Sequence, residues 1–282
     1  MPELPEITAH AERLADNFDG AELSGFRALH LTALKTYDPR PDSAVGRRLS
    51  GAGNRGKYLL LRFDEGDDRL TFVVHLMQGG RLRPDAKKAK KPRGGMARWE
   101  FSDGGALLLT EAGTERKAGV WLVAGDPLEQ EPLDHLGPDI DGVSRDELAD
   151  ILSAENGRVH GALRDQRRLA GIGRMLANEI LHRAELSPFA MTTKLRDEEI
   201  DRLHAAMVET VQHSLAHERT LDDIGRSADR PSRVHHKVGL PCPVCGDEVR
   251  SVEYRRYTVA YCSTCQTDGK VLADNTTSKF LK

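Results

Sequence analysis

The sequence lacks the long apolar runs, the many cysteines and the excess of one charge that mark several protein classes. No apolar stretch approaches the length of a membrane span, and no basic region followed by an apolar one opens the chain. The formal net charge is −3, so overall electrostatics give no indication of a nucleic-acid partner, and any such inference must rest on local patches. The rest is ordinary: 282 residues, 39% hydrophobic and 30% charged, are enough for one large or two medium-sized domains.

The only four cysteines form two close pairs, Cys242 with Cys245 and Cys262 with Cys265. Two such pairs, with sixteen residues between them, are typical of a tetrahedral zinc site in which each tight turn supplies two thiolates. The intervening segment alternates well enough for a small β-hairpin. Two disulfides or four unrelated cysteines are the alternatives, but the spacing favours one structural zinc ion. Cysteines reserved for a metal suit a reducing cytoplasm.

The first 130 residues are predicted to form a β-rich domain that begins with a helix. Pro5 and Glu6 suit a first helical turn, and apolar residues follow at helical spacing as far as Phe18. The basic stretch at 81–98 is interpreted as a solvated mobile loop rather than an ordered contact surface, although such a loop can still touch phosphates. Short strands, which together indicate a sandwich, are expected at 57–63, 70–76, 97–101, 106–110 and 120–123.

The remainder of the chain is predicted to be helical up to the cysteines. Ser144 and Glu147 have the spacing of a capping box, and a longer helix with one apolar face is expected at 196–217. The expected class is therefore α+β with two domains. The expected divisions are a β-sandwich at 1–130, a linker at 131–144, a helical domain at 145–238, a zinc hairpin at 239–270 and a tail at 271–282.

Residues near the N-terminus could carry chemistry, although each has an ordinary structural explanation. Removal of the initiator methionine would leave Pro2 as a secondary amine, which titrates near pH ~8 and can attack a sugar carbon to form an iminium. Glu3 and Glu6 lie within one turn, where one could act as a general acid or base while helix-terminal amides hold the other. Lys57, beside a glycine at a strand entrance, could contact a phosphate or donate a proton. Considered alone, these are simply capping and solvated edge residues.

A second pattern is the tight turn Gly171-Ile172-Gly173. It is expected to join a short helix that ends near Arg168 to a helix at about 174–184. The free N–H groups that begin the second helix form a potential phosphate site, but a helical hairpin with surface arginines explains the pattern equally well. The arginines that flank the turn are Arg167, Arg168 and Arg174.

These patterns occur together in an order that is characteristic of one family. The motifs are Pro2-Glu3-Leu4-Pro5-Glu6, Gly56-Lys57-Tyr58-Leu59, His75-Leu76 with Gly80-Arg81-Leu82, the block from Asp165-Gln166 through Ala170-Gly171-Ile172-Gly173 to Asn178-Glu179, and the four cysteines with Gln266. With them, the chain resembles the bacterial formamidopyrimidine-DNA glycosylase and endonuclease VIII family of base-excision repair enzymes over nearly its full length. The start PELPE favours the formamidopyrimidine branch, because endonuclease VIII begins PEGPE.

The resemblance implies a two-domain enzyme, in which an N-terminal β-sandwich with a leading helix carries the nucleophile. A C-terminal helix–two-turn–helix domain with a zinc finger grips damaged DNA. With the base flipped out, Pro2 attacks C1′ of the sugar, Glu3 protonates the sugar oxygen with support from Glu6, and Lys57 contacts phosphate and assists β-elimination. The implied activity is that of a bifunctional DNA glycosylase/AP lyase for oxidised or otherwise damaged bases. It is expected to hold one zinc ion and to act as a monomer in the bacterial cytoplasm, associated with the nucleoid and with no membrane partner.

Several departures from the family fall on the reading of the lesion. The methionine that the family pushes into the emptied base stack aligns with Gln78, and Ala118 replaces the aromatic wedge near the retained Arg116. Because a missing wedge weakens the hold on a kinked duplex, single-stranded, bulky or crosslinked lesions become candidate substrates in place of 8-oxoguanine. His160 stands where the family has a lysine that handles oxidised guanine. The loop between 221 and 234 is also shorter than in the formamidopyrimidine enzymes.

The finger and the glycine turn depart from the family as well. Arg174 replaces the usual asparagine, and Tyr257 aligns with the finger arginine of the second elimination step, for which the adjacent Arg256 is the tentative substitute. The expected DNA contacts are Gln78, Arg116, Arg174, Asn178, Arg255 and Arg256.

A different class of function, a zinc-hairpin protein that recognises damaged DNA without catalysis, is the alternative. Such a binder has no need of a free proline amine beside an acid, so the set of Pro2, Glu3 and Lys57 argues against it. Catalysis requires that Met1 be removed, because a retained Met1 blocks the proline amine.

Overall fold

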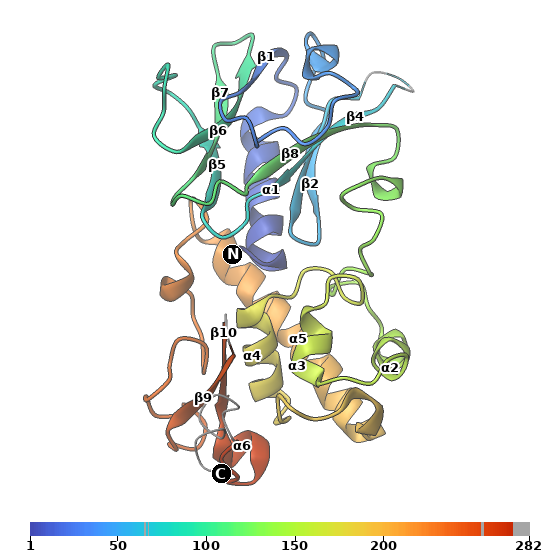
Figure 1. The fold of residues 1–282 in the computed structure, drawn as a ribbon, viewed down its shortest axis with the longest axis vertical. Helices are drawn as coiled ribbons and strands as arrows, with labels where there is room; N and C mark the ends of the chain where they lie inside the picture. Colours follow the sequence, from blue (N-terminus) through green and yellow to red (C-terminus); the bar gives the residue numbers. More distant parts are fainter. Residues whose placement is uncertain (65, 67, 255–256, 273–282) are drawn as a thin grey trace. The chain divides into compact units, whose positions relative to one another are not determined.

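The computed structural model describes residues 1–64, 66, 68–254 and 257–272, and the chain divides into two compact units. The first unit is Met1–His135 with Glu218–Ile224, and the second is Leu136–His217 with Gly225–Lys282. Strands dominate the first unit and helices the second, which confirms the α+β expectation (Figure 1). The finer division into five segments stays a prediction.

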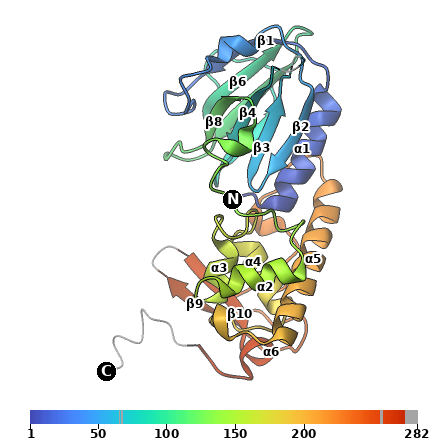
Figure 2. The ribbon, with the colours of Figure 1, turned by 90° about the vertical axis from the view of Figure 1, so that its right-hand side faces the viewer.

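The first unit contains two four-stranded antiparallel sheets. One has the order β1-β6-β7-β5, and the other has the order β2-β3-β4-β8, whose strands lie side by side in Figure 2. The bounds in the first sheet are β1 Leu23–Ala28, β5 Gly80–Pro84, β6 Gly95–Phe101 and β7 Ala106–Glu111. Those in the second are β2 Gly51–Arg55, β3 Tyr58–Arg62, β4 Leu70–His75 and β8 Gly119–Ala124.

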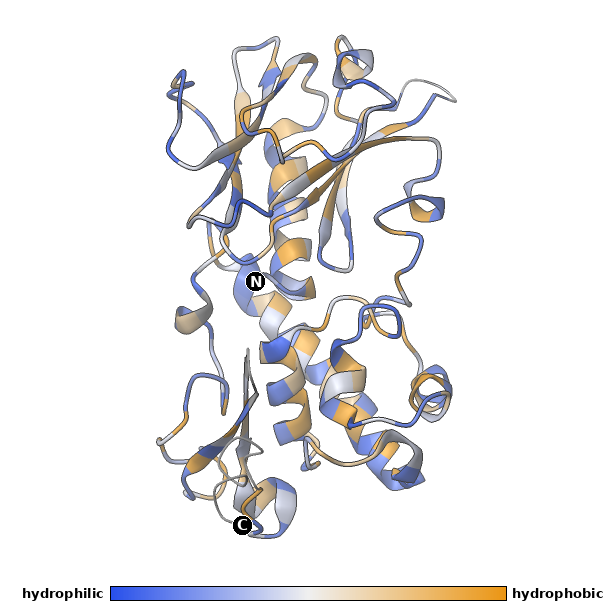
Figure 3. Ribbon diagram, viewed as in Figure 1, coloured by the Kyte–Doolittle hydropathy of each residue, from blue (hydrophilic) through white to orange (hydrophobic). Residues whose placement is uncertain are grey.

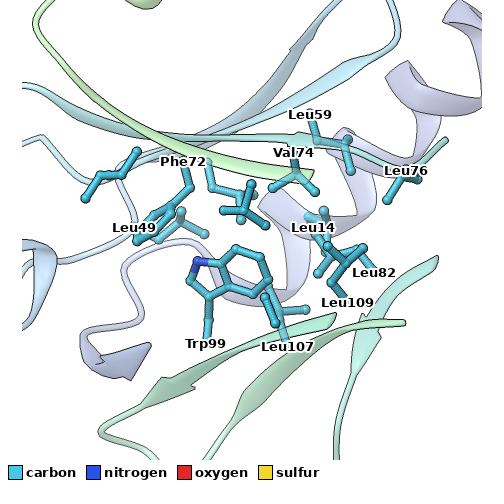
Figure 4. Close-up of a cluster of buried hydrophobic side chains, with 14 of the residues drawn as sticks. Leu14, Leu49, Leu59, Phe72, Val74, Leu76, Leu82, Trp99, Leu107 and Leu109 are labelled. Carbon is cyan, nitrogen blue, oxygen red and sulfur yellow. The ribbon is translucent and has the colours of Figure 1, made fainter. Parts of the chain in front are cut away.

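The leading helix α1 (Leu4–Phe18) packs with both sheets around one hydrophobic core. Apolar residues recur on its buried face, and Figure 3 shows hydrophobic and hydrophilic residues sharing this helix. Trp99 from β6 lies in the core with its ring centroid 5.6 Å from that of Phe72 on β4 (Figure 4). The sandwich thus buries the inner faces of both sheets against each other and against α1.

The interpretation of 81–98 as one solvated loop is wrong at both ends. Residues 81–84 belong to β5 and residues 95–98 to β6, so only 85–94 connect them. Asp85 and Arg98 form a buried ion pair at 2.8 Å, and Arg98 also donates a hydrogen bond to the Ala89 carbonyl at 2.7 Å. The lysines in this stretch suggest a solvated loop, and they are indeed exposed, but Asp85 and Arg98 on either side of them are buried and form this internal pair.

In its described residues, the second unit contains four helices longer than α6 and a hairpin. They are α2 (Arg145–Ser153), α3 (Val159–Arg164), α4 (Arg174–Arg183), α5 (Asp197–Arg219, whose last two residues count with the first unit), β9 (Val249–Tyr254) and β10 (Tyr257–Cys262), followed by the short α6 (Ser263–Thr267). Ser144 and Glu147 form the expected capping box. None of the helices within the described ranges has both the length and the apolar composition needed to cross a membrane.

His10 on α1 couples the stability of the first unit to pH. It is buried, and its Nε2–H donates to the Leu82 carbonyl at 2.8 Å. Burial, and next the charge of Arg13, lower its pKa to about 4. Since the unfolded value is about 6.5, the unfolded chain takes up the proton first as the pH falls, and stability present above pH ~6.5 is lost toward pH 4.

We expect His10→Gln, which keeps an N–H donor for Leu82 but does not titrate, to reduce this dependence. Between pH 7.5 and 5.5 the unmodified protein should lose about 1 kcal/mol more of its unfolding free energy than the variant. Urea unfolding of both proteins at the two pH values measures the difference. Parallel pH dependences would show that His10 is not the coupled group.

Candidate functional site

The start of α1 brings two carboxylates together. Glu3 is the N-cap residue and forms a capping box with Glu6, whose Oε2 accepts the Glu3 backbone N–H at 2.7 Å. Pro2, Glu3 and Glu6 are all buried, whereas Met1 is 39% exposed. The positive end of the helix dipole stabilises negative charge at this position. Glu3 directly follows Pro2 in the chain, so a buried acid lies next to the residue that carries the candidate nucleophile.

Lys57 lies in the turn between β2 and β3 and is only 8% exposed. Its neighbour Tyr58 pairs with His75 across β3 and β4, and their rings lie 4.6 Å apart. Burial lowers the pKa of His75 to about 4, and the positive charges of Lys57 and the N-terminal amino group act in the same direction. The fold thus places Lys57, His75 and the start of the chain close enough to interact electrostatically.

The sequence indicates His75 only as part of a motif and predicts no role for it. Its Nδ1 accepts the backbone N–H of Met77 at 3.1 Å, and its low pKa keeps the ring neutral at pH 7. The proton of the neutral ring is therefore on Nε2, which makes this nitrogen a donor. The sequence signal was indirect, since only the β3–β4 register brings the ring beside Tyr58.

The turn after β4 presents Gln78. Gly80 N–H bonds to the Leu76 carbonyl at 2.8 Å, and a Cβ on Gly80 would lie 2.0 Å from that oxygen, so the close turn requires glycine. Met77 has a positive φ of 53°, and Gln78 is exposed. Exposure suits the expected DNA contact of Gln78, which stays a prediction.

The segment before β8 contains the other two residues expected to read the lesion. Arg116, half-buried with a positive φ of 49°, donates from Nη1 to the Glu111 carbonyl at 2.8 Å. Ala118 is fully buried, and its N–H bonds to the Glu111 carboxylate at 2.7 Å. The position aligned with the aromatic wedge thus offers no side chain to a ligand.

The glycine turn of the second unit is organised by Gln166. This amide accepts the Gly171 N–H at 3.1 Å and donates to the Ile172 carbonyl at 2.9 Å. Gly171 has a φ of 105°, which favours glycine, and Gly173 is the N-cap of α4. Arg174 is exposed at the first position of that helix.

The preceding helix, α3, ends at Arg164 and not near Arg168 as expected. The residues after it form the turn stabilised by Gln166. Arg168 is mostly buried and pairs with Glu155, so it is held within the unit, while Arg167 is exposed. Of the three flanking arginines, Arg167 and Arg174 therefore have the exposure that a phosphate contact needs.

Asn178 on α4 is only 1% exposed and bonds to two histidines. Asn178 Oδ1 lies 3.1 Å from His160 Nε2, and Asn178 Nδ2 lies 3.0 Å from His235 Nδ1. Burial lowers the pKa of His160 to about 4 and that of His235 to about 3, with Arg164 and His236 respectively as the next causes. Both rings are therefore neutral at pH 7. The DNA contact expected of Asn178 stays a prediction, and its amide is occupied by this network.

Glu179, beside Asn178, connects α4 to the segment that precedes the cysteines. Its carboxylate accepts the backbone N–H groups of Arg233, Val234 and His235 at 2.7, 3.0 and 2.8 Å. No local sequence pattern indicates this contact, because the partners are more than fifty residues apart. The interaction fixes the approach of the chain to the cysteine cluster.

The four cysteines form no disulfide and lie together, two in the knuckle at 242–246 and two around the start of α6. Cys242 Sγ is 3.9 Å from Cys265 Sγ, and Cys245 Sγ is 3.4 Å from Cys262 Sγ. Tetrahedral zinc with Zn–S bonds of about 2.3 Å separates its sulfurs by about 3.8 Å. The donor set and its spacing fit such an ion, and His182 lies beside it.

The expected hairpin between the cysteine pairs is present as β9 and β10, with Val249 paired to Cys262. Two further predictions lie outside the described residues. They are the DNA contacts expected of Arg255 and Arg256, and the tentative catalytic role of Arg256.

Comparison with known proteins identifies both units. Residues 1–120 match the formamidopyrimidine-DNA glycosylase N-terminal domain, and residues 136–223 match the formamidopyrimidine-DNA glycosylase H2TH domain. A formamidopyrimidine-DNA glycosylase from Desulforamulus reducens is 30% identical, over 94% of this chain and 99% of that protein. An uncharacterized formamidopyrimidine-DNA glycosylase-like protein from Mycobacterium tuberculosis is 42% identical over 149 residues, which are 52% of this chain and 94% of that protein.

A solved structure has the same fold. The complex between the Lactococcus lactis Fpg and an abasic site containing DNA matches with a TM-score of 0.81 at 22% identity, covering 94% of this chain and 99% of that one.

Proposed function

Because this chain belongs to the formamidopyrimidine-DNA glycosylase family, we propose that it is a bifunctional DNA glycosylase/AP lyase that excises oxidised or otherwise damaged bases. The observation that carries the proposal is the arrangement at the start of the chain. There a buried acid follows Pro2, and Lys57 and the N-terminal amino group both lie near enough to His75 to lower its pKa.

In the proposed reaction, removal of Met1 frees the Pro2 nitrogen, which attacks C1′ of the damaged nucleotide. The bond to the base breaks, and the departing base takes up the proton that the proline nitrogen loses. Glu3 then donates a proton to the ring oxygen as the sugar opens, and a cationic iminium forms. The iminium withdraws electrons, so a proton leaves C2′ and the C3′–O bond breaks by β-elimination. Water then hydrolyses the iminium and releases Pro2.

Lys57 and His75 are proposed to hold the phosphates around the lesion. Lys57 supplies positive charge, and His75 supplies the Nε2–H of a neutral ring. Glu6 supports the acid by fixing the backbone of Glu3. A second, δ-elimination step would need another group, for which Arg256 is the tentative candidate from the sequence.

The buried Ala118 supports a preference for DNA that is already distorted. A protein without an aromatic wedge has less means to stabilise an unstacked duplex, so single-stranded, bulky or crosslinked lesions are proposed as better substrates than 8-oxoguanine. A panel of lesion oligonucleotides in single- and double-stranded form tests this preference. Equal or better cleavage of 8-oxoguanine duplex would contradict it.

The accompanying features are proposals of the same kind. The four cysteines are proposed to hold one structural zinc ion, since their donor set and spacing fit it. The protein is proposed to act on damaged DNA as a monomer in the bacterial cytoplasm, where the reducing environment preserves thiol ligands.

The experiment that tests the function is borohydride trapping on a duplex with one abasic site. Reduction of the iminium should give a covalent protein–DNA adduct, and omission of borohydride should give strand cleavage. The alternative, a damage-binding protein without catalysis, binds the same duplex but forms neither product. Metal-replete protein that binds without trapping would refute the proposal in favour of that alternative.

The lysines between β5 and β6 give a further prediction about DNA affinity. Lys90 and Lys91 are exposed in a segment whose ends are tied by the Asp85–Arg98 pair. If both contact phosphates, replacing them with glutamine makes the negative slope of log K against log salt shallower by roughly 1.8, because each contact contributes about −0.9. The measurement is binding to an abasic-analogue duplex across a salt series.

A control with the same change in net charge is Arg40→Gln combined with Lys194→Gln, two other exposed positions. The control should keep the slope of the unmodified protein. A loop variant whose slope equals that of the control would show that the loop stays in solvent.

A further inference from the structure

His182 brings a fifth metal-binding side chain to the four cysteines. It lies in the last turn of α4 and is only 2% exposed. Its Nε2 is 3.3 Å from Cys242 Sγ. One ligand atom from each of His182, Cys242, Cys262 and Cys265 lies within 4.8 Å of the others. No cysteine pattern indicates this histidine, because it precedes the first cysteine by sixty residues.

The contact with sulfur is the only hydrogen bond of the ring among the described residues. The other ring nitrogen, Nδ1, is buried without a partner there. A buried polar atom without a partner costs about 1–3 kcal/mol. Packing alone does not explain why a ring is buried at this cost. A hydrogen bond from its other nitrogen to the cysteine sulfur does.

The two cysteine pairs offer four sulfurs, which is the number that a tetrahedral zinc site needs without the histidine. Cys245 Sγ lies 3.4 Å from Cys262 Sγ, so a sulfur of the first pair is close to a sulfur of the second. Zinc in structural sites is almost always four-coordinate. Four thiolates around one dication leave a net charge of −2, since each contributes −1, and an N–H donor to a thiolate reduces that excess.

A second polar contact joins the same two parts of the second unit. The Gln266 side chain donates to the Leu186 carbonyl, just after α4, at 2.8 Å and accepts the Cys262 N–H at 2.9 Å. The end of α4 is thus connected to both halves of the cysteine cluster, while the beginning of α4 carries Arg174 at the glycine turn.

We propose that His182 is an outer-sphere partner of the metal: its Nε2–H donates to the Cys242 thiolate, which strengthens metal binding and fixes the cysteine cluster to α4. This inference rests on the proposed zinc site and not on the catalytic activity. His182 is a positioning residue, because it acts on the ion through Cys242.

Two variants of the full-length protein test the assignment. His182→Phe keeps the ring volume and removes the donor, and His182→Gln keeps an N–H donor. Outer-sphere partners typically contribute 10–100-fold to metal affinity. In competition with a chromophoric chelator, we expect His182→Phe to bind one zinc with affinity lower by about that factor, and His182→Gln to recover part of the loss.

The visible and near-ultraviolet spectrum of the cobalt(II) form gives a readout that a packing defect would not change. Unmodified protein and His182→Phe should both show tetrahedral cobalt with four sulfur ligands. The sulfur-to-cobalt charge-transfer band of His182→Phe should move to longer wavelength, because a thiolate without a donor is easier to oxidise. Glutamine should restore the band.

Cys245→Ser separates the outer-sphere role from direct coordination. With four cysteine ligands, this variant loses one sulfur and the charge-transfer intensity falls. If His182 is itself a ligand, with Cys242, Cys262 and Cys265, Cys245→Ser leaves the spectrum unchanged and His182→Phe alters the coordination, which would overturn the proposal. Unchanged zinc affinity and an unchanged band in His182→Phe would overturn it as well. None of these results depends on DNA cleavage, so a failure here leaves the proposed function untouched.

Discussion

Protein from which Met1 has been removed will form a borohydride-trapped adduct with an abasic-site duplex, and protein that retains Met1 will form less than about one hundredth as much. In the retained form the Pro2 nitrogen belongs to a peptide bond, so its lone pair is delocalised and cannot attack C1′. The free amine then lies one residue away, and displacement of a reacting atom by even about 1 Å can cost a hundredfold. Intact mass establishes which form is present in each sample.

Pro2→Gly tests the secondary amine itself. Methionine removal still occurs before glycine, but the primary amine forms an imine that must gain a proton before it draws electrons as strongly as the iminium of proline. We therefore expect trapping to be strongly reduced. The control is Pro5→Ala, which changes a proline in the first turn of α1 without changing the terminal amine. Efficient trapping by the Met1-retaining protein would show that another residue, such as Lys57, is the nucleophile.

Most of the fold follows from local patterns in the sequence. The strands β3, β4 and β8 are continuous apolar runs, and α1 and α5 have one apolar face each, so their types were predicted correctly. The strands β1, β2 and β5 were missed. Their sequences, LSGFRA, GAGNR and GRLRP, are rich in glycine or arginine, and they pair because neighbouring strands offer hydrogen-bond partners.

The chemistry of the candidate site was more visible in the sequence than its supporting residues. Pro2, Glu3 and the cysteines occur at characteristic spacings, so a sequence pattern can identify them. Single histidines have no such spacing: His75 is placed beside Lys57 by a strand register, and His182 meets Cys242 across sixty residues. Burial and long-range hydrogen bonds decide what these rings do, and both exist only in the folded chain.

Glu3→Gln should separate the two reactions of the enzyme. Glutamine keeps a side-chain oxygen for the capping box at the start of α1 but cannot donate the proton that opens the sugar. Removal of a damaged base should fall by about 10²–10⁴. Trapping on a preformed abasic site, whose sugar has already lost the base, should persist. The measurement is the ratio of single-turnover base removal to abasic-site trapping.

Glu6→Gln provides the comparison that makes this ratio informative. It removes the same charge from the same helical turn, so the dipole-related loss of stability, about 0.3–1 kcal/mol, should be similar. Its side-chain oxygen can still accept the Glu3 N–H, which lies 2.7 Å from Glu6 Oε2 in the unmodified protein. Because glutamine at position 6 can still fix the backbone of Glu3, both reactions, and therefore their ratio, should stay near those of the unmodified protein. A Glu3→Gln variant with the same unchanged ratio would show that Glu3 only caps α1 and that the proton comes from elsewhere.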